Sequence, residues 1–572
     1  MTQRQTKRSH VLRRIGVALA STVAVSTVAT TGTQAATSPA AKYGGEVKVA
    51  IFDTFPGFCV GNNPANSALM ATRSVYEGLV EKTKGGDFIG LLAQSWVSSP
   101  DLKEWTFTLR QGIKYHNGQA FNAASVVNNF NAITGRLATR GINPGTAAAF
   151  AANILTFTAV NDNTVKFTLA RPQNDFPGTL YASGRTFMRA DAQLTATTCA
   201  NTAIGTGPFK LVSWDTNSMV VQKNADYWRT DPNTGAKLPY LDKITFTNVK
   251  EGSQRAAAVR KGTYDAAMFT SFSEGTFIRD LRQRKSVVNE TRSPNEYYPS
   301  LWLNQTKPGS PFSNANARKA VVTCIDRANY VKVRSKGETT VARSIVGPTN
   351  PMFTTRGFPK FSVAEAKKFV DAYKAETGAT SLTFSMPADT SGASQSNAKF
   401  LQRTWAQCGI TANITVEETA VIIGKAFNPT ATGGAQNAYD LLPLLLFEGT
   451  DVAFNLPFVI TNSFGSRTDA LAAGFRGPLG ALLNLNHHND TAVDKAFFDG
   501  QAAQSKTGAR TKYQEGTAYL QTNAFMTSIN TGYYTMFTSK KIAGIGKLSI
   551  EKRKTQRTMT NWGIDWTGVY KK

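Results

Sequence analysis

The chain has 572 residues, of which 41% are hydrophobic and 18% charged, an ordinary composition for a globular protein with more than one hydrophobic core. Its 64 Lys and Arg residues against 38 Asp and Glu give a net charge of +26. These bases are spread along the chain, and no basic run alternates with aromatic residues that stack on nucleobases. The distribution of the charge therefore argues against nucleic-acid binding. It indicates adhesion to an anionic cell envelope, or a positive surface potential that the protein tolerates.

Residues 1–36 have the layout of a secretory signal peptide. Basic residues as far as Arg14 precede an apolar stretch over 15–28, and the small residues of Thr33–Ala36 suit cleavage near Ala35 or Ala36. The apolar stretch is too short and too rich in Ser and Thr to span a membrane. The export route, Sec or twin-arginine, stays open. Because no cysteine lies near the cleavage region, we expect an exported protein, periplasmic or associated with the cell envelope, that is not a lipoprotein.

Alternating and amphipathic segments follow the leader. Glu46–Phe52 alternates as a strand and ends in the loop Asp53–Gly57, a position where ligands often bind in α/β folds. Leu69–Leu79 has the apolar face of a helix. Trp105–Arg110 and Thr164–Leu169 alternate as half-buried strands.

The most informative stretch runs from Gly205 to Trp228 and has the sequence GTGPFKLVSWDTNSMVVQKNADYW. Its two apolar runs, Phe209–Trp214 and Met219–Val221, flank a polar turn cluster and predict a β-hairpin. No Gly-Lys-Ser/Thr follows the glycines, which argues against a phosphate-binding loop. Gly-Thr-Gly-Pro-aromatic, a strand ending in Trp, and then Asn-x-Asp-Tyr-Trp together resemble the signature of family 5 of the extracellular solute-binding proteins, the peptide/nickel class. These are the capture subunits of ABC importers.

Two further segments resemble the same family. Residues 74–80, SVYEGLV, resemble its Tyr-Glu-Gly-Leu stretch, and residues 304–327 resemble its Asn…Pro-Phe…Arg-x-Ala…Ile-Asp-Arg helix. The resemblance implies an α/β, two-lobed periplasmic-binding-protein-like fold of class II type with an insert domain in the first lobe. The implied boundaries are 44–85, 205–292 and 533–572 for lobe I, 86–204 for the insert domain and 293–532 for lobe II.

The second half of the chain also has α/β character. A strand at Leu382–Ser385, a helix at Phe400–Gln407 and a strand at Ile414–Val416 predict a β-α-β step. Tyr439–Phe447 has the pattern of a buried strand, and Tyr533–Phe537 that of a strand returning to the first lobe. Late helices are expected over 493–504 and 511–522.

Four cysteines, Cys59, Cys199, Cys324 and Cys408, suit disulfides in an exported protein. Of the three possible pairings we favour Cys59 with Cys199, within the first lobe, and Cys324 with Cys408, between two helices of the second. Buried free thiols are the alternative.

The sequence carries no Cys-x-x-Cys, His-Glu-x-x-His, Gly-x-Ser-x-Gly, P-loop or EF-hand pattern. The adjacent His487 and His488 would point apart rather than at one metal, and His116, alone in a turn, is expected to be structural or exposed. We therefore expect a binding protein rather than an enzyme, with no catalytic residue, metal site or cofactor.

A closing two-lobed receptor needs a cleft with aromatic walls and a few fixed charges. A buried ammonium requires a carboxylate partner. The resemblance implies that Asp451, following Phe447, takes the free amine of a peptide, although the family's Trp-Gly-x-x-Asp is Phe-Glu-Gly-Thr-Asp here. A loop carboxylate facing water is the alternative.

Four other residues are candidates for ligand contacts. Phe55 and Tyr298 could stack on a ligand or pack in the core, and Arg185 and Arg343 could bind an anionic end or be solvated. We expect a monomer that binds a di- or oligopeptide and meets an ABC permease in the membrane, with no nucleic acid. The alternatives are another solute, such as a metal chelate or an oligosaccharide, and an exported enzyme on this scaffold.

Overall fold

The computed structural model describes residues 42–62, 66–142, 147–294, 298–426, 428–429, 435–436, 438–446, 451–461, 483–551, 554–555, 558–560 and 563–572. The expected signal peptide lies outside these residues. None of the helices that the structure describes is long and apolar enough to cross a membrane.

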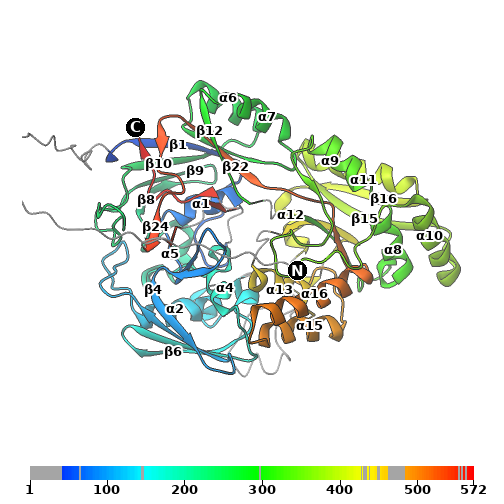
Figure 1. Cartoon of the computed structure of the whole chain (residues 1–572), viewed down its shortest axis with the longest axis horizontal. Coiled ribbons are helices and arrows are strands. Elements are labelled where there is room, and N and C mark those ends of the chain that lie inside the picture. The colour runs from blue at the N-terminus through cyan, green and yellow to red at the C-terminus, as the bar shows by residue number, and fades with distance from the viewer. Residues whose placement is uncertain are drawn as a thin grey trace, which may run out of the picture. The chain divides into compact units, whose positions relative to one another are not determined.

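A mixed sheet of seven strands organises the first part of the structure (Figure 1). Across the sheet the strands are β12 (Val288–Arg292), β22 (Tyr534–Ser539), β11 (Ala266–Thr270), β1 (Glu46–Ile51), β10 (Lys243–Asn248), β9 (Ser218–Lys223) and β8 (Phe209–Trp214). β1 is parallel to β10 and β11, whereas β22 is antiparallel to both of its neighbours. The predicted hairpin is confirmed as β8 and β9 at one edge, and the predicted returning strand as β22.

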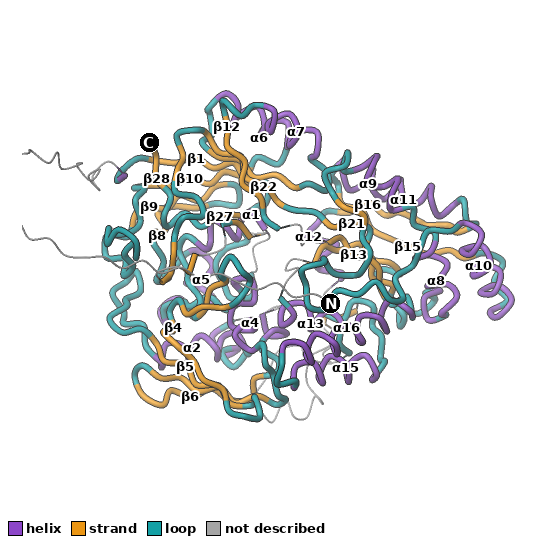
Figure 2. The backbone as a smooth tube through the Cα atoms, in the orientation of Figure 1, coloured by secondary structure: helices purple, strands orange, loops and turns teal. Residues whose placement is uncertain are grey.

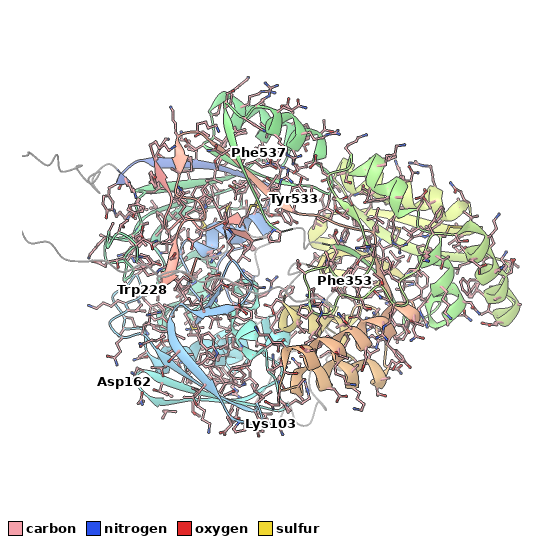
Figure 3. All side chains as sticks on the ribbon, in the orientation of Figure 1. Lys103, Asp162, Trp228, Phe353, Tyr533 and Phe537 are labelled. Carbon is pink, nitrogen blue, oxygen red and sulfur yellow. A yellow bond between two sulfur atoms is a disulfide. The ribbon has the colours of Figure 1, made fainter. Side chains whose placement is uncertain are left out.

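The helices α6 (Gly252–Lys261) and α7 (Gly275–Gln283) pack against this sheet through Val259, Ile278 and Leu281. The same core holds Phe537, which is labelled in Figure 3, and Phe269. The ring centroids of these two residues are 5.8 Å apart. Apolar residues that alternate along the strands thus bury one face of the sheet under the two helices.

The helix α1 (Asn66–Arg73) ends six residues before the end predicted for Leu69–Leu79, so that prediction is wrong in its second half. The carbonyl oxygens of Ser74 and Val75 accept the N–H groups of Phe209 and Gly207 at 3.0 and 2.9 Å. Because the hairpin entry uses these carbonyls, the helix does not continue past Arg73. A Cβ atom on Gly205 would lie 2.0 Å from the carbonyl oxygen of Val75, which explains why glycine stands there.

A four-stranded antiparallel sheet follows in the chain, in the order β4, β5, β7, β6. It shares one hydrophobic core with the other face of the seven-stranded sheet, with Phe107, Phe130 and Phe167 at its centre. The elements of this region are β2 (Val80–Lys82), β3 (Phe88–Gly90), β4 (Ala93–Ser98), β5 (Glu104–Leu109), α2 (Ala123–Ile133), α3 (Ala147–Phe150), β6 (Ile154–Asn161), β7 (Thr164–Leu169), α4 (Phe176–Tyr181), the short 3-10 helix η3 (Ala182–Gly184) and α5 (Ala196–Asn201).

The part of the chain from β13 (Tyr298–Leu303) onward contains a second α/β arrangement, with helices flanking a parallel strand pair (Figure 2). This pair, β15 (Leu382–Asp389) and β16 (Ile410–Glu417), is joined through α11 (Gly392–Ala406), which confirms the predicted β-α-β step. β13 pairs antiparallel with β19 (Leu441–Leu446) and β20 (Met526–Ser528). The other helices used below are α8 (Ala315–Thr323), α9 (Arg327–Arg334), α10 (Val363–Thr377), α13 (Val452–Val459), α15 (Thr491–Ala502) and α16 (Lys506–Thr522).

Both expected disulfides are present in the structure, Cys59 with Cys199 and Cys324 with Cys408. Cys324 follows α8 and Cys408 follows α11, so the second bridge joins two helices on the same core. The bridges span 140 and 84 residues of sequence, and such long closed loops restrict the unfolded chain strongly.

Candidate functional site

The helix α13 is the element around which the predicted site residues gather. It begins at Asp451, whose Oδ1 accepts a hydrogen bond from the Phe454 N–H at 3.4 Å and so caps the first turn. The side chains of the helix are buried, and it contacts α3, α4 and η3. A helix that is apolar all round must be covered on every side, and here segments far apart in the sequence cover it.

Tyr298 contacts α13 from β13. Its side chain is fully buried, and its hydroxyl group donates a hydrogen bond to Oδ1 of Asn455 at 3.0 Å. On the same strand, Trp302 packs against Phe458 with ring centroids 6.1 Å apart. Tyr298, which was expected to stack on a ligand, is thus hydrogen-bonded to α13 and helps to fix the position of that helix.

Arg185 contacts α13 from the other side, directly after η3. Its guanidinium carbon lies 5.3 Å from the ring centroid of Phe454 and 5.6 Å from that of Phe150. The two rings are stacked, with centroids 4.9 Å apart. This cation–aromatic arrangement places a half-buried positive charge near the N-terminal turn of α13, the turn that Asp451 caps.

Two carboxylates come together where α4 meets α13. Asp175 precedes α4, and Asp451, 3% exposed, precedes α13. Gly178 of α4 lies so close that a Cβ atom there would be 2.8 Å from Oδ1 of Asp451. Burial, and next the nearby charge of Asp451, raise the pKa of Asp175 to about 6.

Amide side chains complete this contact. Oδ1 of Asp175 accepts hydrogen bonds from Nε2 of Gln173 at 3.0 Å and of Gln501 at 3.4 Å. Nδ2 of Asn174 donates to the carbonyl oxygens of Gly500 and Ala503 at 2.9 and 2.8 Å. Asn174 and Asp175 are therefore attached by polar contacts to α15 and the residue that follows it, more than 320 positions later in the chain, while Gly178 approaches Asp451 closely.

The remaining predicted site residues lie elsewhere. Phe55 is 3% exposed and belongs to the core shared by the two large sheets, and Arg343 is exposed to solvent. Phe447 lies outside the described residues. The structure thus gathers Arg185, Tyr298 and Asp451, and adds Asp175, Asn174 and Asn455, none of which belongs to a recognisable sequence motif.

The hairpin motif forms a separate polar centre around Glu77, which the sequence did not single out. Glu77 is buried and accepts hydrogen bonds from Thr206 Oγ1 at 2.9 Å, Trp228 Nε1 at 2.9 Å and Tyr227 Oη at 2.6 Å. Burial raises the pKa of Glu77, and the charge of Arg229 and these three donors act against that rise. The carboxylate of Glu77 therefore joins three segments of the sequence: Tyr-Glu-Gly-Leu, Gly-Thr-Gly-Pro and Asp-Tyr-Trp.

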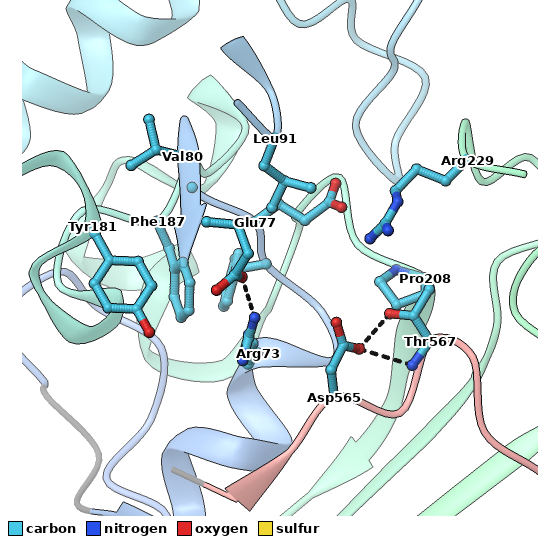
Figure 4. Close-up of a pocket in the computed structure, with 13 residues that line it drawn as sticks. Arg73, Glu77, Val80, Leu91, Tyr181, Phe187, Pro208, Arg229, Asp565 and Thr567 are labelled. Carbon is cyan, nitrogen blue, oxygen red and sulfur yellow. Dashed lines mark hydrogen bonds and ion pairs between the residues drawn. The ribbon is translucent and has the colours of Figure 1, made fainter. Parts of the chain in front are cut away.

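A small cavity borders this centre (Figure 4). Its volume of about 20 Å³ has room for one water molecule, not for a solute. Asp565, in its wall, accepts hydrogen bonds from Thr567 N and Oγ1 at 2.8 and 2.5 Å. Although burial opposes it, the charges of Arg73 and Arg229 lower the pKa of Asp565. The cavity is part of a charged structural network.

His116 is hydrogen-bonded to the Gly-Thr-Gly-Pro segment that begins the hairpin. The N–H of Gly205 donates to its Nδ1 at 3.3 Å, so the proton is on Nε2, which donates to the carbonyl oxygen of Gly207 at 3.0 Å. Burial lowers the pKa of His116 to about 4. His116 is thus a neutral structural residue, as expected.

Solved structures show the class of protein to which this fold belongs. DppA of Helicobacter pylori, an ABC transporter-associated periplasmic binding protein in complex with the peptide STSA, matches 93% of this chain and 98% of its own length with a TM-score of 0.74 and 20% identity. AgaA of A. tumefaciens R10, in complex with agropinic acid, matches 92% of this chain and 99% of its own with a TM-score of 0.75 and 19% identity. The α/β fold of periplasmic binding proteins, predicted above, is confirmed.

The family follows from the sequence comparisons. The model of the bacterial extracellular solute-binding proteins, family 5 Middle, matches residues 87–444. The glutathione-binding protein GsiB of Pectobacterium atrosepticum is 28% identical over 379 residues, which are 64% of this chain and 69% of that relative. The chain belongs to family 5 of the bacterial extracellular solute-binding proteins, which are non-enzymatic binding components of ABC transporters.

Proposed function

We propose that this protein binds a short peptide with a free amino group and delivers it, outside the cytoplasm, to an ABC permease. The observation that carries this proposal is the position of Asp451, buried at the start of α13, with Arg185 and Tyr298 in contact with side chains of the same helix. A carboxylate in that position can neutralise a ligand ammonium, and Arg185 offers a charge for a ligand carboxylate.

The names of similar proteins support a small peptide as the solute. GsiB is named for glutathione, a tripeptide with a free amine, and DppA was solved with the peptide STSA. AgaA was solved with agropinic acid, so a different small solute is the competing assignment. In the proposed cycle lobe II, with α13, closes onto the insert domain, with α4, and the contacts of residues 174–178 hold the closed form.

The substitution Asp451→Asn tests the assignment without removing the helix cap, because Asn caps helix N-termini as well as Asp does. We expect the affinity for a free-amine peptide to fall about 30-fold or more, since removing one partner of a buried charge pair costs about 2 kcal/mol or more. The same peptide with an acetylated amine is the matched control and should bind both proteins with similar, weak affinity. Equal affinity of D451N and the wild type for the free-amine peptide, measured by calorimetry, would exclude this role.

Native mass spectrometry of protein purified without denaturation identifies the solute class directly. Glutathione, dipeptides, tetrapeptides, agropinic acid and an oligosaccharide are then compared by the shift that each causes in melting temperature. A peptide as the bound species supports the proposal. A sugar, a metal chelate or turnover of an added peptide would contradict it.

A further inference from the structure

The fold gathers basic residues that are scattered in the sequence. Six exposed bases lie at the ends of helices and in the turns beside β12 and β22, and we call them the basic surface: Lys261, Arg279, Lys285, Lys332, Lys336 and Lys541. α6 and α7 lie side by side at one edge of the structure, and α9 continues along that edge (Figure 1). Bases that are far apart in the sequence are therefore carried by helices along one edge of the structure (Figure 1).

Contacts between the elements connect the parts of the chain that carry the basic surface. Arg260 of α6 and Arg284, just after α7, both pair with Asp280 of α7, at 3.4 and 3.0 Å. Nη1 of Arg279 donates to the carbonyl oxygen of Lys336 at 3.3 Å, which joins α7 to the turn after α9. Nζ of Lys540 donates to Oδ1 of Asn289 at 2.7 Å, which places the turn after β22 against β12.

Four acidic residues of this region pair with bases outside the basic surface. Glu274 pairs with the buried Arg255, and both Glu290 and Glu338 pair with Arg282. Asp265 pairs with Lys571. These four carboxylates thus neutralise bases outside the basic surface, and the six bases of that surface are exposed to solvent.

Two exposed apolar side chains accompany the lysines. Val287 follows Lys285 by two positions and Val333 follows Lys332 directly, and each is 40% exposed. Lysines with apolar neighbours suit a membrane interface, where phosphates meet the charges and the apolar groups enter the headgroup region. A soluble polyanion would use the charges alone.

We propose that the basic surface binds an anionic lipid bilayer and holds the protein at the membrane where it meets its permease. Each Lys near an anionic bilayer strengthens partition roughly fivefold, and salt screens the attraction. This surface is distinct from α13 and α4, so membrane binding and solute binding can be measured separately.

The test compares full-length variants in a sedimentation assay with vesicles of phosphatidylglycerol and phosphatidylcholine. The triple variant K261Q/K285Q/K332Q should lower the partition coefficient at least tenfold at low salt. K84Q/K114Q/K367Q removes the same charge from exposed lysines elsewhere and should change it less than threefold. All variants carry the same residues 1–41, so the difference between the two triple variants isolates the basic surface. Equal losses, or no binding of the wild type to anionic vesicles, would overturn the proposal.

A second pair of measurements separates a bilayer from a soluble polyanion. V287S/V333S should weaken binding to vesicles about threefold and leave binding to soluble polyphosphate unchanged. If this variant binds vesicles as the wild type does, the partner is a polyanion rather than a bilayer and the proposal fails. Unchanged melting temperatures of all variants, and unchanged stabilisation by the solute, exclude misfolding as the cause.

Discussion

Glu77 and Asp175 are both buried carboxylates, but their surroundings differ in kind. Glu77 receives three hydrogen bonds from one hairpin region and lies near Arg229. Asp175 receives two amide N–H groups on one oxygen and faces Asp451. The first arrangement is complete within a single core. The second joins the residues before α4 to α15, more than 320 positions later in the chain, which suits a contact that can open.

Removing Glu77 should have the largest effect. Glu77→Ala leaves the hydroxyl groups of Thr206 and Tyr227 and the indole N–H of Trp228 without their acceptor, and leaves the charge of Arg229 less compensated. We expect a loss of about 3–5 kcal/mol in the free energy of unfolding, measured by urea denaturation. Glu77→Gln keeps an acceptor oxygen and should lose less. Wild-type stability of E77A would refute the structural role of this centre.

Filling the gap between α4 and α13 should have an intermediate effect. Gly178→Ala places a methyl group 2.8 Å from Oδ1 of Asp451 and 3.0 Å from Cβ of Ala453, so the two helices must separate. We expect a loss of about 1–3 kcal/mol and weaker solute binding. Gly392→Ala is the matched control, because its Cβ atom meets nothing within 4 Å, and it should not destabilise. Similar melting temperatures of G178A and G392A would show that the helices are not in firm contact.

Asp175→Asn should change the free energy of unfolding least, and the direction of the change should depend on pH. The pKa of Asp175 is raised from 3.8 to about 6, so the native state binds this proton more tightly than the unfolded chain does. The stability of the wild type therefore falls as the pH rises from about 4 to about 6, and stays lower above that range. D175N should be more stable than the wild type by about 1–2 kcal/mol at pH 7.5 and no more stable at pH 4.

Melting temperatures between pH 4 and pH 7.5 check this sign. Asp226→Asn, at an exposed carboxylate, is the control and should leave the pH profile unchanged. A wild-type profile that is parallel to that of D175N would show that Asp175 does not titrate in this range.

Local patterns predicted the strands well because alternation reports burial directly. The predicted strands Phe209–Trp214, Met219–Val221 and Trp105–Arg110 have bounds within two residues of those of β8, β9 and β5. The helix expected over Leu69–Leu79 was too long, since the carbonyl groups of Ser74 and Val75 bond to the hairpin. That competition is tertiary and leaves no periodic trace in the sequence.

The candidate site residues were named from a family resemblance for Asp451 and from residue type alone for Tyr298, Arg185 and Phe55. Asp451, Tyr298 and Arg185 gather on α13, whereas Phe55 is in the core because the loop after β1 is covered rather than open. Asn174 and Asp175 were missed, since nothing local distinguishes an Asn-Asp pair whose partner Gln501 lies 326 positions later. Contacts between residues so far apart in the sequence follow from the tertiary fold and not from local propensity.

The position of β22 has a consequence for how a nascent molecule acquires its shape. This strand lies between β11 and β12, which are made more than 240 residues earlier. β11 and β12 do not pair with each other. Each pairs with β22, so the sheet between them forms only when Tyr534–Ser539 is present. A polypeptide still leaving the ribosome or a translocation channel therefore cannot finish its largest sheet, and final compaction has to follow the release of nearly all of its length.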